Sequence, residues 1–409
     1  MKGGSWFGGI QCAWRVVPIK RVARLGTGHT PDRSNPALWE DCTVPWVTVA
    51  DIQRLPGAGL RPLMETEQHV SELGVRHSAA VIHPAGTVML SRTASIGYSC
   101  LIGRPMATTQ AFVTWTPSEL VDSRYLLLAV RALAPELDRL AYGSTHKTIY
   151  MPDISTLMMP LPPLDEQRMI ADFLDAETTR IDALIAKKRR MIGLIFERWA
   201  SFLHEILGAL DREPTVVRRV AILTAGGTPS VDDTDCWDDA GCPWVSIGDM
   251  SSVRQVIATQ RGLTPLGIAR ARLHVGQAGT VLFAMYASVG AVSRLGVDAC
   301  WNQAILGING VSGLADNDFL EFWLMHIRPT LEGIVRANTQ SNLNAEQVGA
   351  LPFPAIDVGE QVALAARMRR MRDRLDKLVR NMGRQIELLQ ERRQALITYA
   401  VTGQLPIPV

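Results

Sequence analysis

The sequence of 409 residues has few cysteines, and none of them are spaced for metal or redox chemistry. The six cysteines stand at positions 12, 42, 100, 236, 242 and 300, so no two of them form a C-x-x-C motif. Zinc ribbons and dithiol redox sites are therefore disfavoured, because both use closely spaced cysteine pairs. We expect the reduced, buried thiols of a cytosolic protein.

Long apolar runs are also missing. The first 21 residues contain no continuous apolar core, so we expect no signal peptide. One uncharged stretch, 273–293, is rich in Gly, Ser and Thr, and its counterpart in the internal repeat described below carries Arg92. We therefore predict a buried strand pair in these stretches rather than a membrane-spanning helix. A cytoplasmic protein without a membrane partner is expected.

The common catalytic motifs are absent. There is no P-loop, and Gly26-Thr27-Gly28 lacks the third glycine of a dinucleotide fingerprint. His204-Glu205 lacks the second histidine of H-E-x-x-H, and neither G-x-S-x-G nor the Asn/Asp-Pro-Pro-aromatic tetrapeptide of amino-methyltransferases occurs. None of the six lysines follows an acidic residue by two positions, which disfavours a metal-dependent nuclease. We predict a binding protein with no catalytic residue and no metal site; a duplicated hydrolase with a novel site is the enzyme alternative.

The net charge is small as well. The chain has 42 Lys and Arg against 40 Asp and Glu, which leaves +2. The apolar fraction of 47% and the charged fraction of 20% are ordinary for a folded protein and exclude bulk disorder. Strong, non-specific DNA binding is not predicted for this chain alone, because such binding needs many uncompensated cations. Specific readout needs only a few Arg, Asn, Gln or His side chains at base edges, so the composition is compatible with it.

What the sequence does contain is an internal duplication. At a shift of 198 positions, 13 of the 31 residues from 21 to 51 are identical to those from 219 to 249. Average residue usage would give roughly two identities. The repeated features include Gly28-x-Thr30-Pro31, a pair of tryptophans, Gly86-Thr87-Val88 and Glu166-Gln167. The chain is therefore predicted to be a tandem repeat of a unit of nearly half its length.

Each repeat has two parts. Residues 1–160 and 213–352 combine short apolar runs with helical stretches, which predicts two similar globular α+β domains. The expected strands include Pro45–Ile52, Thr87–Ser91 and Val281–Ala284, and the expected helices include Ser123–Ala134 and Phe319–Ile327. Residues 161–212 and 353–409 follow Pro-rich stretches and are predicted to form long helices, with Asp165 and Asp357 as N-caps.

The long helices have a seven-residue apolar period, which indicates a coiled coil. Two such helices in one chain are expected to pair with each other; packing of each helix on its own globular domain is the alternative. The predicted pairing residues are Leu174, Ile181, Ile185, Ile192, Ile195 and Trp199 in the first helix, and Met368, Leu375, Met382, Leu389 and Leu396 in the second.

Candidate DNA contacts lie in the globular parts, at loop positions where the two copies differ. A solvated loop residue is the alternative interpretation at each of them. The tryptophans, in contrast, recur in both copies beside apolar residues and are predicted to be core. The candidate contacts are Arg92, His146 and Lys147 in the first copy, and Tyr286, Gln340 and Asn342 in the second.

These motifs together resemble the specificity (S) subunit of type I restriction–modification systems. The resemblance depends on the two Gly-x-Thr-Pro motifs and on Pro160-Leu-Pro-Pro-Leu-Asp-Glu-Gln167 at the start of a long helix. The sequence from Arg392 to Gly403, which ends in Ala-Val-Thr-Gly, is similar as well.

The resemblance implies two target-recognition domains, each of which reads one half of a split site in double-stranded DNA. It implies that the two helices form an antiparallel coiled coil that sets the spacing of the half-sites and docks two methyltransferase (M) subunits. S-adenosylmethionine would be held by the M subunits, and ATP and Mg by restriction (R) subunits, so this chain itself would bind no cofactor. The alternative is a non-catalytic structural adaptor, with two protein-binding heads on a coiled-coil spacer.

Overall fold

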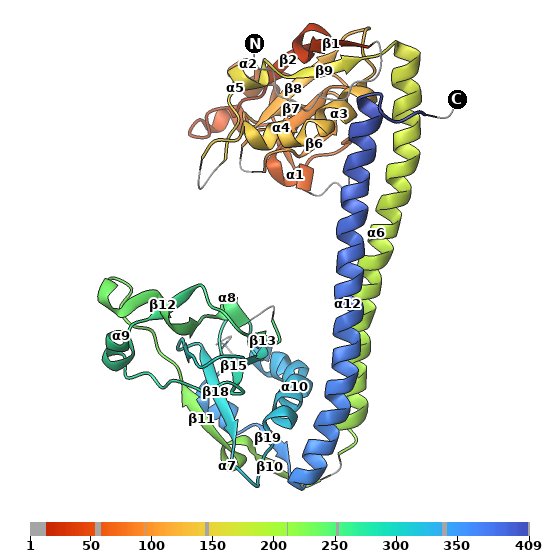
Figure 1. The fold of residues 1–409 in the computed structure, drawn as a ribbon. Coiled ribbons are helices and arrows are strands. Elements are labelled where there is room, and N and C mark those ends of the chain that lie inside the picture. The colour runs from red at the N-terminus through yellow and green to blue at the C-terminus, as the bar shows by residue number, and fades with distance from the viewer. Residues whose placement is uncertain are drawn as a thin grey trace. The chain divides into compact units, whose positions relative to one another are not determined.

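The computed structural model describes residues 14–53, 59–93, 95–143, 147–210, 212–250, 253–337 and 342–407. They form two compact units (Figure 1). Unit 1 comprises the chain up to Arg190 together with the part from Met382 onward, and unit 2 comprises Met191–Asn381. Below, head 1 denotes the globular part of unit 1 (described residues up to 161), and head 2 denotes that of unit 2 (described residues 212–356).

Head 1 contains three small sheets (Figure 1). The four-stranded sheet has the order β2 (Ala23–Thr27), β8 (Phe112–Pro117), β5 (Val88–Ser91), β6 (Ser99–Leu101). The three-stranded sheet has the order β4 (Gln68–Val70), β3 (Val44–Val47), β7 (Ala107–Thr108), and β1 (Arg15–Pro18) pairs with β9 (Met158–Leu161). The helices are η2 (Ile19–Arg21), η3 (Pro36–Trp39), α1 (Val49–Gln53), α2 (Glu72–Arg76), α3 (Ser123–Ala132), α4 (Ala134–Arg139) and α5 (Met151–Ile154).

Head 2 repeats this topology with one added strand (Figure 1). Its larger sheet has the order β11 (Ala221–Ala225), β18 (Ile305–Gly310), β15 (Val281–Ala284), β16 (Val292–Leu295), β13 (Gln255–Val256). The smaller sheet has the order β14 (Arg261–Leu263), β12 (Trp237–Val245), β17 (Cys300–Trp301), and β10 (Pro214–Val216) pairs with β19 (Pro352–Pro354). The helices are α7 (Val217–Val220), η4 (Thr234–Cys236), α8 (Ile247–Met250), α9 (Pro265–Arg270), α10 (Asn317–Ala337) and α11 (Ala345–Gly349).

The shared strand order confirms the duplication and the predicted α+β class of both heads. Even the mixed pairing recurs, because β3 runs parallel to β7 and β12 runs parallel to β17. The predicted strand 281–284 is present as β15, and the predicted strand 87–91 is present as β5, which begins one residue later at Val88. Both strands are fully buried, which is why their sequences are almost continuously apolar.

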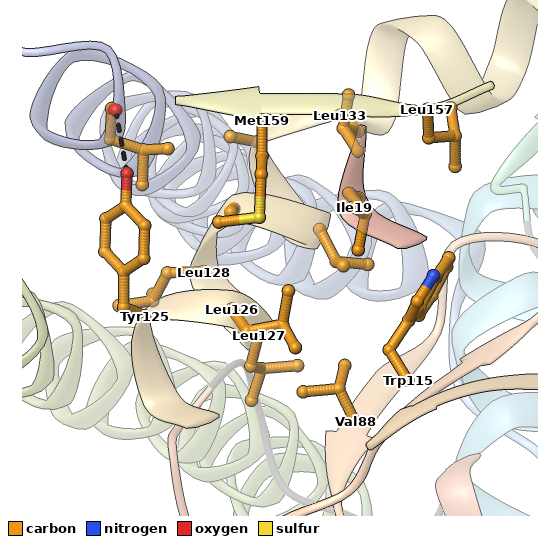
Figure 2. Packing of buried hydrophobic residues seen from close by; sticks show 14 of the residues in the cluster. Ile19, Val88, Trp115, Tyr125, Leu126, Leu127, Leu128, Leu133, Leu157 and Met159 are labelled. Atoms are coloured by element: carbon orange, nitrogen blue, oxygen red, sulfur yellow. Dashed lines mark hydrogen bonds between the residues drawn. The ribbon is translucent and has the colours of Figure 1, made fainter. Parts of the chain in front are cut away.

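The core of head 1 lies between the four-stranded sheet and α3, most of whose side chains are buried (Figure 2). Trp115 and Val88 cover the sheet side, and Leu126 and Leu127 cover the helix side. The hydroxyl of Tyr125 donates to the backbone carbonyl of Pro160 at 3.0 Å and also reaches that of Val401 at 3.4 Å. Burial of this aromatic side chain therefore leaves no unpaired hydroxyl, and it joins α3 to the last turn of the C-terminal helix.

Two long helices carry the heads: α6 (Leu164–Leu207) and α12 (Val358–Val401). Within unit 1, Asp182 pairs with Arg393, and Lys188 donates a hydrogen bond to Gln385. Residue numbers along α12 therefore fall as those along α6 rise. The helices are therefore antiparallel there, as the resemblance implies. In unit 2, Arg372 lies over Trp199 and Arg367 over Phe202, which gives the same direction.

A buried glutamine fixes the start of each long helix to its head. Gln167 is fully buried; its Oε1 accepts the Asp122 N–H at 2.8 Å, and its Nε2 donates to the Leu120 and Pro162 carbonyls. Gln361, equally buried, makes the same three bonds in head 2, to the N–H of residue 316 and the carbonyls of residues 314 and 356. These bonds explain the repeated Glu-Gln motif, because a buried amide is stable only when its polar atoms are paired.

Several expected boundaries were wrong. The expected strand Pro45–Ile52 ends at Val47, because the Thr48–Asp51 turn starts helix α1. Asp165 is not an N-cap but lies within the first turn of α6, whereas Asp357 does cap α12 by accepting the Gly359 N–H. The expected helix Ser123–Ala134 ends at Ala132, and the expected helix Phe319–Ile327 is part of α10, which continues through Pro329.

Candidate nucleic-acid interface

The Gly-x-Thr-Pro motif fixes a loop at the end of the first strand of each larger sheet. In head 1, Thr30 Oγ1 donates to Gln110 Oε1 at 2.7 Å, and in head 2 Thr228 makes the same bond to Gln303. A Cβ on Gly28 would come within 1.9 Å of a backbone carbonyl oxygen of the facing strand β7, so only glycine fits. The motif therefore has a structural role in both heads.

The paired tryptophans lie beside this loop. Trp39 and Trp46 pack edge to face with ring centroids 5.5 Å apart, and Trp237 and Trp244 do so at 5.1 Å. Trp46 and Trp244 are buried, which agrees with their prediction as core, while Trp39 and Trp237 are half-buried. Edge-to-face packing of this kind stabilises aromatic pairs beyond their buried area.

A repeated aspartate closes the turn that follows β3 in head 1 and β12 in head 2. Asp51 accepts the backbone N–H and the hydroxyl of Thr48, at 2.7 and 2.9 Å. Asp249 accepts the same two groups from Ser246, at 2.8 and 2.7 Å. Together with the Gly-x-Thr-Pro loop and the tryptophans, this turn forms a common framework on which the unlike loops of the two heads are mounted.

Head 1 has an open cavity of about 510 Å³ on this framework. It lies where the Gly-x-Thr-Pro loop, the end of β3 and the segments after β5 and β7 meet. Its lining combines polar and basic side chains with apolar ones and the ring of Trp46. The lining residues include Thr30, Arg33, Trp46, Gln68, Arg92 and Gln110.

Of the predicted contacts in head 1, Arg92 lines this cavity. Its Nε donates to the Gln110 carbonyl at 3.2 Å and its Nη1 donates to the Ile149 carbonyl at 3.3 Å. Lys147 is exposed and lies two residues from Ile149, whose backbone N–H donates to the Arg92 carbonyl at 2.9 Å. The structure therefore brings these two predicted segments together, while His146 lies outside the described residues.

The corresponding segments of head 2 also meet. The backbone N–H of Leu343 donates to the Met285 carbonyl at 3.0 Å. Exposed Asn342 precedes Leu343 and Tyr286 follows Met285, so this bond joins the two segments that carry the predicted contacts. The ring of Tyr286 is half-buried and packs on the core of head 2. Gln340 lies outside the described residues. The DNA contacts proposed from sequence at these positions remain predictions.

Sequence reasoning missed two arginines that lie over the tryptophans. The guanidinium carbon of Arg33 lies 5.7 Å from the Trp39 ring centroid and 5.9 Å from that of Trp46. In head 2, Arg261 lies 3.4 Å from the Trp237 centroid. A signal was present for Arg33, because it stands two residues after the Gly-x-Thr-Pro motif, where the other copy has Val231. Nothing local marks Arg261, which reaches its tryptophan from the neighbouring strand β14.

The described cysteines are free thiols. Cys100, Cys236 and Cys300 are buried, and Cys42 and Cys242 are half-buried. Burial raises the pKa of Cys100 to about 12 and, with the nearby Cys242, that of Cys300 to about 12. These two thiols are therefore unreactive near neutral pH.

The predicted pairing residues of the long helices are buried or half-buried, and several also contact a head. Leu174 and Leu396 join the core of head 1, and Trp199, Met368 and Leu375 join the core of head 2. Ile181 and Ile185 are buried within unit 1. The remaining members, all half-buried, are Ile192, Ile195, Met382 and Leu389. The apolar rows thus combine helix pairing with packing on the adjoining head.

Other large apolar side chains of the two helices are exposed. On α6 and α12 of unit 1 they are Met169, Leu184, Leu388 and Tyr399. On those helices in unit 2 they are Met191, Leu194, Phe196, Val362 and Leu378. They are the candidate contacts for a partner protein on these helices.

Within the described ranges, no helix is long and apolar enough to cross a membrane. The same ranges hold no cluster of three or more His, Cys, Asp or Glu side chains placed to bind a metal ion.

The described geometry is that of two similar α+β heads, each joined to antiparallel helices, and comparison with known proteins shows what the chain resembles. The family model of the type I restriction modification DNA specificity domain matches residues 12–192. The MjaIX specificity subunit of Methanocaldococcus jannaschii, a type I restriction enzyme subunit, is 28% identical over 185 residues, which cover 45% of this chain and 41% of that protein. A type I specificity subunit of Escherichia coli is 23% identical over 209 residues, which cover 49% of this chain and 50% of that protein.

The resemblance to type I specificity subunits is therefore confirmed, although each matched stretch spans half or less of the length of these two relatives. A solved structure described as showing complex assembly and conformational transition of the type I R-M system has the same fold. It covers 96% of this chain and 98% of its own, with a TM-score of 0.70 and 16% identity.

Proposed function

We propose that this chain is the DNA sequence-recognition subunit of a type I restriction–modification complex in the cytoplasm. Each head reads one half of a bipartite site in double-stranded DNA. The main support is that residues 12–192 match a DNA specificity domain and that head 2 repeats the sheet topology of head 1. A duplicated reader suits a site with two specified halves, since each copy can carry its own loops on one framework.

Catalysis belongs to partner subunits in this proposal. Two M subunits hold S-adenosylmethionine and methylate an adenine in each half-site, and R subunits use ATP and Mg to cleave DNA. A target base inside a duplex has to be turned out of the stack before methylation, and that step falls to the M subunit. The chain itself is a non-catalytic reader without a cofactor.

The exposed apolar residues of α6 and α12 are the proposed docking surface for the M subunits. Charged substitution there should weaken assembly while the heads stay folded. We expect Phe196→Glu, at a side chain that is 53% exposed, to reduce co-purification of M by at least tenfold. The exposed Arg384→Glu on α12 serves as a charge control. Undiminished capture of M by Phe196→Glu would count against this surface.

The decisive experiment is a genome-wide map of methylated adenines with and without the gene for this chain. We expect a bipartite methylated motif that disappears on deletion and returns on complementation. If the methylated adenines were the same with and without the gene, the adaptor interpretation would be the better one. A second arm incubates the isolated chain with S-adenosylmethionine and DNA, and methyl transfer by the chain alone would contradict the non-catalytic role.

The long helices act as a spacer in this proposal. Inserting one heptad between Ile181 and Trp199 of α6, with a matching heptad in α12, keeps the apolar rows in register. We expect both half-sites to be kept while the number of unspecified base pairs between them rises, since each added residue lengthens a helix by about 1.5 Å. An unchanged methylated motif after the insertion would exclude the spacer role.

A further inference from the structure

The cavity of head 1 contains hydrogen-bond donors and positive charge without a described counter-charge. Arg33 and Arg92 both line it, and neither forms an ion pair with any described residue. Trp46 also lines it; its indole N–H is buried and has no acceptor among the described residues. The two arginine side chains are cationic and have donors only, so the ligand that suits this wall is an acceptor, and preferably an anion.

The hydrogen bonds of the Arg92 side chain restrict which group of DNA it can bind. Two of its donors are tied to the backbone carbonyls of Gln110 and Ile149, and the side chain is half-buried. An arginine that reads a guanine in the major groove has to extend its fork into that groove. Arg92 cannot extend without breaking both bonds, so it suits a group that projects toward the protein, as a backbone phosphate of DNA does.

Head 2 lacks the same arrangement. Met285 occupies the place of Arg92 and Val231 that of Arg33. The indole N–H of Trp244, the counterpart of Trp46, donates to the Gly227 carbonyl at 3.0 Å. The donor left unpaired in head 1 is therefore paired in head 2, and neither arginine recurs at its own position. The cation beside the tryptophans of head 2 is Arg261 of β14, which lies over Trp237.

We propose that the cavity of head 1 is a phosphate clamp, in which Arg92 and Arg33 bind one backbone phosphate of the first half-site and fix the position of head 1 on DNA. This inference rests on the proposed function. The clamp adds affinity and register without reading a base, and head 2 has no equivalent at this place.

The test is the salt dependence of binding by the complex of this chain with its M subunit, measured on a duplex that contains the mapped site. Each phosphate contact contributes about 0.9 to the slope of log K against log salt. We expect the double variant Arg92→Met/Arg33→Gln, which removes both cations from the one phosphate, to reduce the slope by about that amount, and Arg92→Met alone, which installs the head 2 residue, to reduce it by part of that amount while the methylated motif stays the same. Arg33→Gln, at an exposed position, should reduce the slope without affecting folding. Arg139→Met removes the charge of one exposed side chain of α4 and should leave the slope unchanged.

The outcomes separate the two proposals. A wild-type complex without sequence-specific methylation would overturn the proposed function itself. A wild-type complex that methylates its site, with unchanged slopes in both Arg92→Met and Arg33→Gln, would overturn the clamp alone. Relaxed specificity at one base of the first half-site in Arg92→Met would also overturn the clamp, because it would show base reading.

Discussion

The two heads share a framework but are joined to their helices by opposite charges. In head 1, Arg124 of α3 pairs with Asp172 of α6 at 2.6 Å. In head 2, the residue at the matching place is Asp318 of α10, and it pairs with Arg369 of α12. The head therefore supplies the cation in one junction and the anion in the other.

The junction of head 2 is also more heavily bonded. Arg294 of β16 pairs with Asp318 and, at 2.9 Å, with Glu321, which is only 3% exposed. Arg254 extends the cluster to Asp373 of α12 at 2.6 Å. At the junction of head 1, the pair of Arg124 and Asp172 is more exposed. The comparison teaches that the framework is common to both copies, whereas the strength of attachment to the helices is particular to each.

The largest expected effect tests the common framework. Gln167→Ala and Gln361→Ala each leave one backbone N–H and two carbonyls without their buried partner, so each should cost about 4 kcal/mol of unfolding free energy, at about 1–3 kcal/mol for each unpaired group. Urea unfolding measures the loss. Exposed Glu360→Ala is the control, with a change below about 0.5 kcal/mol. A large loss of unfolding free energy in only one of the two glutamine variants would show that the two buried glutamines do not have equivalent roles in the two heads.

The ion cluster of head 2 comes next. Arg294→Met removes the cation shared by Asp318 and Glu321 and should cost about 3 kcal/mol, because a largely buried carboxylate loses its partner. Hydrogen exchange should localise the loss to head 2. The exposed pair of Arg384 and Glu387 gives the control, and Arg384→Met should change stability by less than about 0.5 kcal/mol. Protection lost equally in head 1 would contradict a junction particular to head 2.

Acid should affect head 1 through His83, whose place in head 2 is taken by Gly276. Burial, and secondarily the charge of Arg24, lowers the pKa of His83 to about 4. The unfolded chain therefore binds a proton that the folded chain does not between pH 6.5 and 4, so stability is full above pH 6.5 and falls as the pH falls. We expect wild type to lose about 2 kcal/mol more than His83→Gln between pH 7 and 4.5.

Urea unfolding of both proteins at the two pH values measures this difference. His326 of head 2, whose pKa burial and His204 also lower, is present in both proteins and cancels. Equal acid sensitivity of wild type and His83→Gln would show that His83 does not titrate in this way.

The smallest expected effect is at the junction of head 1. The side chains of Arg124 and Asp172 are 36% and 68% exposed, so water screens their attraction. A double-mutant cycle of Arg124→Gln and Asp172→Asn should give a coupling energy below about 1 kcal/mol. A coupling as large as the effect of Arg294→Met would remove the contrast between the two junctions.

Much of the fold could be predicted from sequence because its signals are local. Apolar runs marked the strands at 87–91 and 281–284, and seven-residue spacing marked the two long helices. Asp165 was misplaced, because the helix begins one residue earlier, after Pro163, and an acidic residue suits the first turn as well as the cap. The predicted contact Arg92 lies at a cavity, but sequence did not show that its guanidinium is tied to Gln110 and Ile149.

The sequence by itself determined two similar α+β heads and two long amphipathic helices. The apolar periodicity is a pattern among near neighbours in the chain, and the duplication is visible when the two copies are aligned. Only the tertiary structure decided which charges meet at each junction, that Arg33 and Arg92 share one cavity, and that Trp46 lacks an acceptor where Trp244 has one. Those relations join residues far apart in the chain, such as Arg254 and Asp373. They depend on how sheets and helices pack, which no local pattern records.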